Sequence, residues 1–242
     1  KLETFLRGHF KRTPIFRIDR DSTRHKNQLK EMLGQIAIGK SCLMIGTQMI
    51  AKGHHFPNIT LVAIINADTG LFSPDFRGQE YMAQTITQVS GRTGRANQRG
   101  EVIIQTRHAS HKTLQNLMRG GYNEFATIIL EERKNGRMPP FCRLAMLKAN
   151  SRALTTSIKF LANCEVFVQE INHKYHQKVE SIGPFPAPLE KRGGKFRAHL
   201  MLKSNTQATL QRLLTELVKR LEKIKTTPGL TWYLDVDPAD LT

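Results

Sequence analysis

The sequence predicts a two-part α/β protein, with a parallel-sheet lobe over residues 1–138 and a smaller α+β domain over residues 139–242. Three observations predict this. Short apolar runs alternate with helical patterns in the first part, which is typical of parallel strands joined by helices. The second part reads as strand, helix, strand, strand, helix, strand. Between them, Pro139-Pro140 forbids a helix and favours an extended connector, so we place the boundary near Arg137.

The elements of the first part follow from its apolar pattern. Runs rich in Ile and Val that lack polar alternation are typical of strands buried on both faces, and they occur at residues 14–18, 42–45, 61–66 and 102–105. Apolar residues at helical spacing predict helices at 26–38, 79–90, 110–118 and 122–135, the last two separated by Gly120-Gly121. Because parallel sheets bind ligands at the carboxyl ends of their strands, the loops after Ile45 and Asn66 are the expected ligand-binding region.

The second part is predicted to be ferredoxin-like. Strands are expected at residues 143–149, 179–184, 195–202 and 231–236, and helices at 154–175 and 207–225. This order is that of the split βαβ plan.

The charge of the chain indicates a polyanionic partner. Its 242 residues carry a net charge of +17 and give a pI of about 10.2, with +10 on residues 1–138 and +7 on residues 139–242. Such an excess attracts phosphate backbones through counterion release, although a merely solvated cationic surface is the alternative. No apolar run reaches the roughly 18 to 20 residues of a membrane span, so no membrane partner is expected. Three widely spaced cysteines predict no metal site or disulfide framework and favour a reducing, cytoplasmic setting.

The most informative motif is Q-x-x-G-R-x-G-R, at residues 88–95. Gly91 and Gly94 allow the backbone to approach a ligand closely. Arg92 and Arg95 lie three residues apart, so both guanidinium groups can reach one phosphate, as arginine fingers do in phosphoryl transfer. The alternative is that glycine and arginine simply end a helix, where a cation suits the helix dipole.

A second motif follows the predicted strand that ends near Gly46. Thr47 caps a short predicted helix, and exposed amides with a hydroxyl at a helix start suit a nucleic-acid phosphate. An ordinary helix cap is the alternative for this motif taken alone.

These two motifs carry a family resemblance. The strings GTQMIAKGHHFPN and DTGLFSPDFRGQEYMAQTITQVSGRTGRA resemble motifs V and VI of superfamily 2 helicases, and specifically those of the PriA family of replication-restart helicases. The similarity continues through GEVIIQT, GPFPAPLEKRGGKFR and WYLDVDP and covers nearly the whole chain. The resemblance implies a second RecA-like helicase lobe followed by the C-terminal domain of that family, which is related to a small ribosomal protein fold.

The resemblance also implies roles for individual residues. Arg92 and Arg95 would face the γ-phosphate of ATP, and Gln88 would contact phosphate or the attacking water. Gly53, Gly91 and Gly94 would lie against the nucleotide, while Thr47 and Gln48 would touch the backbone of the translocated strand. One departure concerns His55, which stands where an acidic residue is common in the superfamily, and we assign it no role.

Two expected motifs are absent from the sequence. It has no G-x-x-x-x-G-K-[ST] and no D-E-x-H, so ATP and Mg²⁺ are expected to be bound mainly by a missing first lobe. The cysteine-rich Zn²⁺ segment of the family is missing as well, and the first residues are neither an initiator Met nor a signal peptide. We therefore expect a fragment of a longer protein that is inactive alone.

The strongest feature of the second part is the string KRGGKFR. Lys191, Arg192, Lys195 and Arg197 surround a Gly-Gly turn between predicted strands, and Phe196 can stack on an unpaired base. A solvated hairpin tip is the alternative. The resemblance adds two ligands between which the sequence does not choose, branched DNA and the acidic tail of single-strand DNA-binding protein.

Together these observations predict part of an ATP-dependent 3′–5′ DNA helicase that recognises stalled or branched forks and initiates primosome assembly. Expected partners are branched and single-stranded DNA, single-strand DNA-binding protein and other primosome proteins, in a bacterial, nucleoid-associated setting. We expect no metal site within this chain. Asp235 and Asp237 alternate on a predicted strand and so face the same side; a metal-binding carboxylate pair is one interpretation, and an edge or a salt-bridge partner for the basic surface is the one we favour. The rival hypothesis is a non-catalytic nucleic-acid-binding or scaffold protein derived from a helicase lobe.

Overall fold

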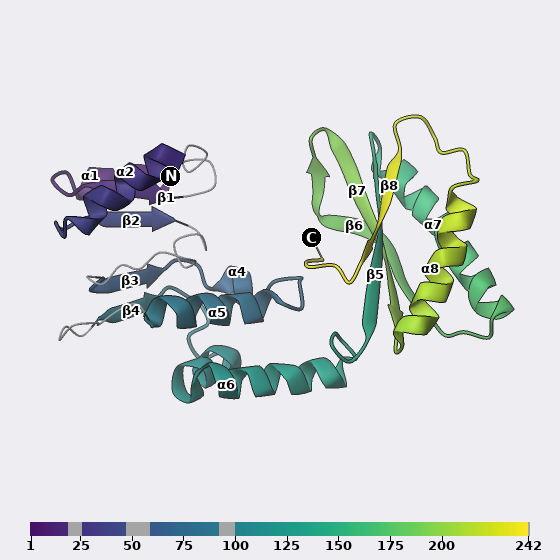
Figure 1. Cartoon of the computed structure of the whole chain (residues 1–242), viewed down its shortest axis with the longest axis horizontal. Coiled ribbons are helices and arrows are strands. Elements are labelled where there is room, and N and C mark those ends of the chain that lie inside the picture. Colours follow the sequence, from purple (N-terminus) through teal and green to yellow (C-terminus); the bar gives the residue numbers. More distant parts are fainter. Residues whose placement is uncertain (19–25, 47–58, 92–99, 242) are drawn as a thin grey trace. The chain divides into compact units, whose positions relative to one another are not determined.

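The computed structural model describes residues 1–18, 26–46, 59–91 and 100–241. The chain divides into two compact units, one made of Lys1–Phe72 and Gln79–Glu124, the other of Ser73–Gly78 and Phe125–Thr242. The first contains parallel strand pairs and the second an antiparallel sheet, which confirms the predicted α/β class (Figure 1). The boundary expected near Arg137 stays a prediction, and the structure groups residues from Phe125 onward with the second unit.

The first unit is built on two parallel strand pairs. β1 (Ile15–Ile18) pairs with β2 (Leu43–Gly46), and β3 (Leu61–Ile64) pairs with β4 (Glu101–Ile104). The other elements that begin in this part of the sequence are helices: α1 (Leu2–His9), α2 (Lys26–Ala37), α4 (Asp68–Leu71), α5 (Gly78–Ser90) and α6 (Lys112–Asn135). The strands and helices predicted within the described residues form, and α1 and the short α4 were not predicted; the short helix expected after Thr47 lies outside the described residues. The predicted break in α6 is confirmed, because Gly121 has a φ of 72° that interrupts the helix.

The expectation that the strands of the first unit are buried on both faces is wrong, because β1 buries only Ile15 and Ile18 and no residue of β2, β3 or β4 is buried. The exposure is clearest for β3 and β4. Their side chains alternate between exposed and half-buried, and Leu61 and Ile103 are 53% and 48% exposed. Successive side chains of a strand point to opposite faces. The pattern therefore means that one face of this pair is open to solvent and the other is only partly covered.

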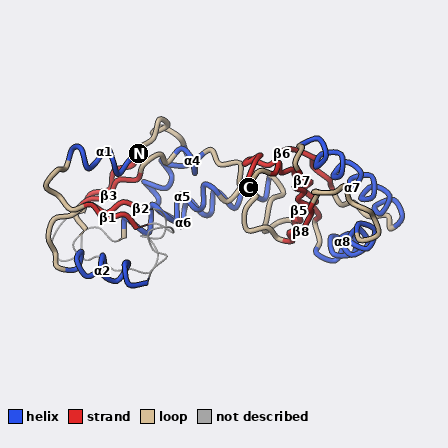
Figure 2. The backbone as a smooth tube through the Cα atoms, turned by 90° about the horizontal axis from the view of Figure 1, so that it is seen from above, coloured by secondary structure: helices blue, strands red, loops and turns tan. Residues whose placement is uncertain are grey.

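The second unit forms a four-stranded antiparallel sheet in the order β6-β7-β5-β8. Its elements are β5 (Arg143–Ser151), α7 (Leu154–Lys174), β6 (Glu180–Arg192), β7 (Lys195–Ser204), α8 (Gln207–Leu221) and β8 (Thr231–Val236). Both helices lie on the same side of the sheet (Figures 1 and 2). This order of elements is the one that the split βαβ interpretation predicts.

Two apolar clusters cover the two faces of this sheet. On the helix side, Ala145, Leu147 and Ala149 of β5 pack with the leucine stripe of α8 and the inner face of α7. The intervening residues Leu144 and Met146 belong to the other cluster, whose remaining members are Cys142, Met201 and Leu241. The alternation along β5 therefore divides the strand between two cores.

Residues 73–78 complete the second of these cores, although in the sequence they follow α4 and reach the first residue of α5. Phe76 packs against the cluster that contains Met146. The guanidinium groups of Arg77 and Arg133 stand over the Phe76 ring, 4.6 and 5.0 Å from its centroid. This short segment is thus an integral part of the second unit.

The same segment holds the backbone that follows β8. Arg77 Nη1 donates to the carbonyl oxygens of Pro238 and Ala239, the latter at 2.8 Å. Asp75 is 7% exposed, and its Oδ2 accepts from the Leu241 amide at 3.3 Å while its Oδ1 accepts from the Arg77 amide at 2.9 Å. Residues far apart in the sequence are therefore joined by charged hydrogen bonds, which are stronger than neutral ones.

Candidate nucleic-acid interface

α5 presents the first residue of the glycine-arginine motif to solvent. Met82, Ala83 and Ile86 are buried and share one face of the helix, because residues three and four apart lie on the same side. Gln88 is exposed in the last turn, and the Gly91 amide donates to the Thr87 carbonyl at 3.0 Å directly after the helix. Gln88 and Gly91 are thus at the helix end, as the motif predicts.

The remaining predicted nucleotide and strand contacts lie outside the described residues. They are Thr47, Gln48, Gly53, Arg92, Gly94 and Arg95. β2 ends at Gly46, directly before Thr47, and α5 ends directly before Gly91, so the described elements lead into both motifs at the expected places. The arginine-finger and strand-contact assignments themselves stay predictions.

The loops at the carboxyl ends of β3 and β4 hold each other through hydrogen bonds. The Asp68 carboxylate accepts from the Thr106 hydroxyl at 2.5 Å and from the Arg107 amide at 3.1 Å. The Ala67 amide donates to the Gln105 carbonyl at 3.0 Å. The Thr106 bond first, and the Arg107 amide second, lower the pKa of Asp68, so this acid stays ionised and the two loops form one ordered edge.

Ligands were expected in the loop after Asn66, but this hydrogen-bond network was not predicted from the sequence. Its signal was present, since a polar residue follows each of two parallel strands at the same edge. The partners Asp68 and Thr106 are 38 residues apart, and only the pairing of β3 with β4 brings them together.

The predicted basic hairpin forms between β6 and β7. Gly193 and Gly194 have φ values of 57° and 78°, which is what a type I′ turn of two residues requires. Arg192 pairs directly with Lys195, and Lys191 pairs with Phe196. The glycines therefore place the cations at the exposed tip, as the sequence predicts.

The hairpin sorts its side chains onto two faces. Lys195 and Arg197 are two residues apart and share a face with Arg192, the cross-strand partner of Lys195. On the opposite face, Lys191 Nζ lies 5.0 Å from the centroid of the half-buried Phe196 ring. Like charges opposite each other destabilise a strand pair, so the tip carries a repulsion that a bound anion would relieve.

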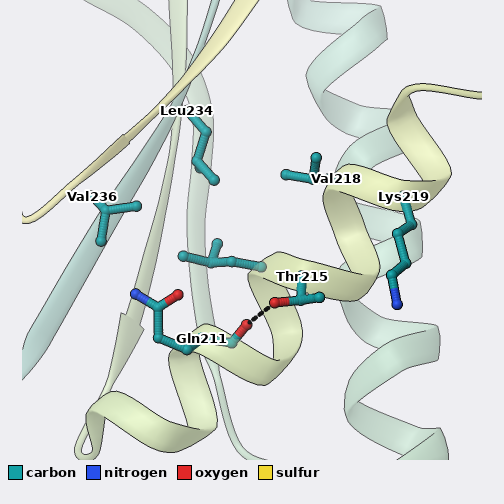
Figure 3. A pocket seen from close by; sticks show the side chains of 7 residues that line it. Gln211, Thr215, Val218, Lys219, Leu234 and Val236 are labelled. Carbon is teal, nitrogen blue, oxygen red and sulfur yellow. Dashed lines mark hydrogen bonds between the residues drawn. The ribbon is translucent and has the colours of Figure 1, made fainter.

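A shallow groove lies between α8 and the edge strand β8. It has a volume of about 360 Å³. Gln211, Leu214, Thr215, Val218 and Lys219 of α8 line it together with Leu234 and Val236 of β8, and Figure 3 shows Val218 pointing toward Leu234. The Thr215 hydroxyl donates to the Gln211 carbonyl at 2.9 Å. The sequence analysis missed this groove, because its apolar residues have the same spacing as those of the core.

The acidic residues near the C-terminus do not form the pair that the sequence analysis weighed. β8 ends at Val236, and Asp237 has a φ of 50°, so Asp237 is not on the strand. Asp235 lies 3.0 Å from Lys148 Nζ, which confirms its interpretation as a salt-bridge partner. Within the described ranges, no three His, Cys, Asp or Glu side chains are arranged to hold a metal, and no helix is long and apolar enough to cross a membrane.

Two protein-family models match the chain. Residues 2–97 match the helicase conserved C-terminal domain, and residues 134–239 match the C-terminal domain of primosomal protein N. A solved structure described as an amidohydrolase/peptidase from Burkholderia cenocepacia covers 39% of this chain and 27% of its own, with 17% identity and a TM-score of 0.27, which is too low to indicate a shared fold.

The curated relatives are replication restart proteins named PriA. The protein from Haemophilus influenzae is 42% identical over 100% of this chain and 32% of its own length. Those from Chlamydia pneumoniae and Bacillus subtilis are 35% and 32% identical, over 98% and 93% of this chain and 31% and 28% of their own lengths. The chain thus spans about a third of the length of these relatives. With both family models matched in sequence order, the chain belongs to the PriA family.

Proposed function

We propose that this chain is part of an ATP-dependent 3′–5′ DNA helicase that restarts replication at stalled or branched forks. In this proposal residues 1–138 act as the second lobe of the motor, and residues 139–242 bind DNA. The observation that carries it is the match of a helicase domain and a primosomal domain in this order on one chain. The exposed position of Gln88, four residues before Arg92, supports the assignment of the motor motif.

In the motor, the chain would supply fixed positive charge to the transferred phosphate. Arg92 and Arg95 would stabilise the charge that develops on the γ-phosphate, and Gln88 would position phosphate or the attacking water. Thr47 and Gln48 would grip the strand backbone, and Gly53, Gly91 and Gly94 would allow the nucleotide to approach. The sequence has no phosphate-binding loop of the G-x-x-x-x-G-K-[ST] type, so ATP and Mg²⁺ would be held mainly by another part of the full-length protein. The Zn²⁺ segment of the family would lie there as well.

In the second part, the basic hairpin would bind the DNA backbone. Arg192, Lys195 and Arg197 would neutralise phosphates from one face, which also relieves the repulsion between Arg192 and Lys195. Phe196 would contact a base once Lys191 moves from its ring. The acidic tail of single-strand DNA-binding protein is the competing ligand, and other primosome proteins complete the proposed partners.

The motor assignment is tested in the full-length protein. Arg92→Ala should lower the DNA-stimulated ATPase rate by about 10³-fold or more, while the affinity for DNA stays close to that of the wild type. The matched control is Arg119→Ala, which removes an exposed arginine of α6 and should change neither property. An unchanged ATPase rate in Arg92→Ala would refute the arginine-finger role.

The 242-residue chain by itself provides a second test. We expect it to bind DNA but to hydrolyse no ATP. Turnover above that of the Arg92→Ala/Arg95→Ala double variant would contradict the assignment of nucleotide binding mainly to another part of the protein.

A further inference from the structure

A solvent-exposed aromatic cluster lies at the ordered edge formed by the loops after β3 and β4, within the first unit. Phe72 follows α4, and 54% of its surface is exposed. The His108 ring lies 4.7 Å from the Phe72 ring, centroid to centroid, at 71°, and the His111 ring lies 5.7 Å away at 86°. Two imidazoles thus fix a phenyl ring that still presents more than half of its surface to water.

Hydrogen bonds fix the backbone at His108 and the ring of His111 before any ligand arrives. The His108 amide donates to the Thr106 hydroxyl at 2.9 Å, and that hydroxyl is bonded to Asp68. The Thr113 amide donates to His111 Nδ1 at 3.3 Å, which ties this imidazole to the start of α6. A preorganised surface loses little conformational freedom on binding.

Two cationic residues adjoin the histidines of the cluster in the sequence. Arg107 and Lys112 are exposed, and in the described part of the chain neither side chain forms an ion pair. The ionised Asp68 carboxylate accepts hydrogen bonds from Thr106 and from the Arg107 amide and attracts the Arg107 side chain without forming an ion pair with it. An exposed aromatic face beside free cations is the combination that binds single-stranded nucleic acid, with bases stacking on rings and phosphates meeting the cations.

We propose that Phe72, held by His108 and His111, stacks on an unpaired base of single-stranded DNA, and that Arg107 neutralises an adjacent phosphate. The proposal rests on the DNA binding put forward above and extends it to a base contact in the first unit. It assigns a ligand to two exposed side chains, Phe72 and Arg107, to which the sequence analysis gave no role.

The test compares DNA with and without bases, using the 242-residue chain and fluorescence anisotropy of labelled 12-mers. One probe is oligo(dT), and the other has the same sugar-phosphate backbone with abasic sites. Phe72→Ala should weaken binding of oligo(dT) by about 5- to 100-fold and leave binding of the abasic strand unchanged, because only the former can stack. Phe72→Trp should retain the tight binding.

Phe5→Ala is the matched control. Phe5 is 60% exposed and also contacts a histidine ring, that of His9 at 4.2 Å, but it lies on α1 and should affect neither probe. Arg107→Ala should weaken both probes and reduce the salt dependence of binding by about one phosphate contact.

Three outcomes overturn the proposal: equal losses on both probes in Phe72→Ala, no loss on either, or the same loss in Phe5→Ala. If the wild-type chain binds neither probe, the proposed DNA binding fails together with this subsite. If the wild type binds oligo(dT) and Phe72→Ala binds it equally well, only the stacking subsite fails.

Discussion

Asp235→Asn should destabilise the second unit, because it removes the counter-ion of a buried lysine. Lys148 is 5% exposed, and its Nζ lies 3.0 Å from Asp235 Oδ2. Its neighbour across the strands is His199, which is fully buried. Burial first, and the positive charge of Lys148 second, lower the pKa of His199 to about 4, so this imidazole stays neutral at pH 7 and adds no second positive charge beside Lys148.

The expected loss is about 2 kcal/mol of unfolding free energy. Removing one partner of a fully buried pair costs about 3–5 kcal/mol, whereas an exposed pair contributes about 0.2–1 kcal/mol. The side chain of Asp235 is 35% exposed, so water replaces part of the lost interaction and the value falls between these limits. With a urea dependence of about 2 kcal/mol per molar, the midpoint should fall by about 1 M.

Tryptophan fluorescence during urea unfolding measures this change in the second unit. Trp232 is the only tryptophan of the sequence, and its ring stacks on Phe160 at 6.4 Å within the second unit. The matched control is Lys148→Met combined with Asp235→Leu, which removes both charges and should recover most of the stability. A wild-type midpoint in Asp235→Asn, or a double variant as unstable as the single one, would refute the reasoning.

Three further changes have expected outcomes. Arg77→Ala should lower the unfolding free energy of the second unit by about 2 kcal/mol, because two backbone carbonyls lose a charged donor, while the exposed control Arg119→Ala should keep the wild-type urea midpoint. The lowered pKa of His199 contributes stability that is fully present above pH 6.5 and declines as the pH falls toward 4. The urea midpoint of His199→Gln should therefore depend less on pH between 6.5 and 4 than that of the wild type. Lys195→Glu should raise the urea midpoint slightly, because it replaces a repulsive pair with Arg192 by an attractive one. The same variant should bind DNA more weakly in an anisotropy titration. A lower urea midpoint with unchanged affinity for DNA would contradict the role of the hairpin.

The spacing of residues along the sequence was sufficient to predict most helices and strands. It failed where contacts with other parts of the fold decide the place at which an element ends. The strand expected at residues 179–184 does not stop there, although Pro184, Pro186 and Pro188 follow. The strand continues to Arg192 because β6 lies at the edge of the sheet, where a missing amide donor is tolerated, and because its pairing with β7 is irregular beyond Ile182. The helix expected at 207–225 ends earlier, at Leu221, after the last buried leucine of its stripe.

In the candidate nucleic-acid interface, too, one feature could be predicted from local sequence and another could not. The hairpin was predictable because two glycines and four cations within seven residues fix both the turn and its charge. The aromatic cluster was not, because Phe72 and His108 meet only through the pairing of β3 with β4. An isolated phenylalanine after a short helix has the same sequence signature as any surface residue.

The contacts of residues 73–78 determine whether the second unit stays soluble when it is produced alone. A polypeptide trimmed to start at the double proline would lack Phe76, and its sheet would expose Leu144 and Met146 to water. The backbone at Pro238 and Leu241 would also lose its hydrogen bonds to the side chains of Arg77 and Asp75. Such a truncated domain should aggregate. Supplying a peptide that contains Ser73–Gly78 in trans, or fusing that peptide to the domain, should restore its solubility.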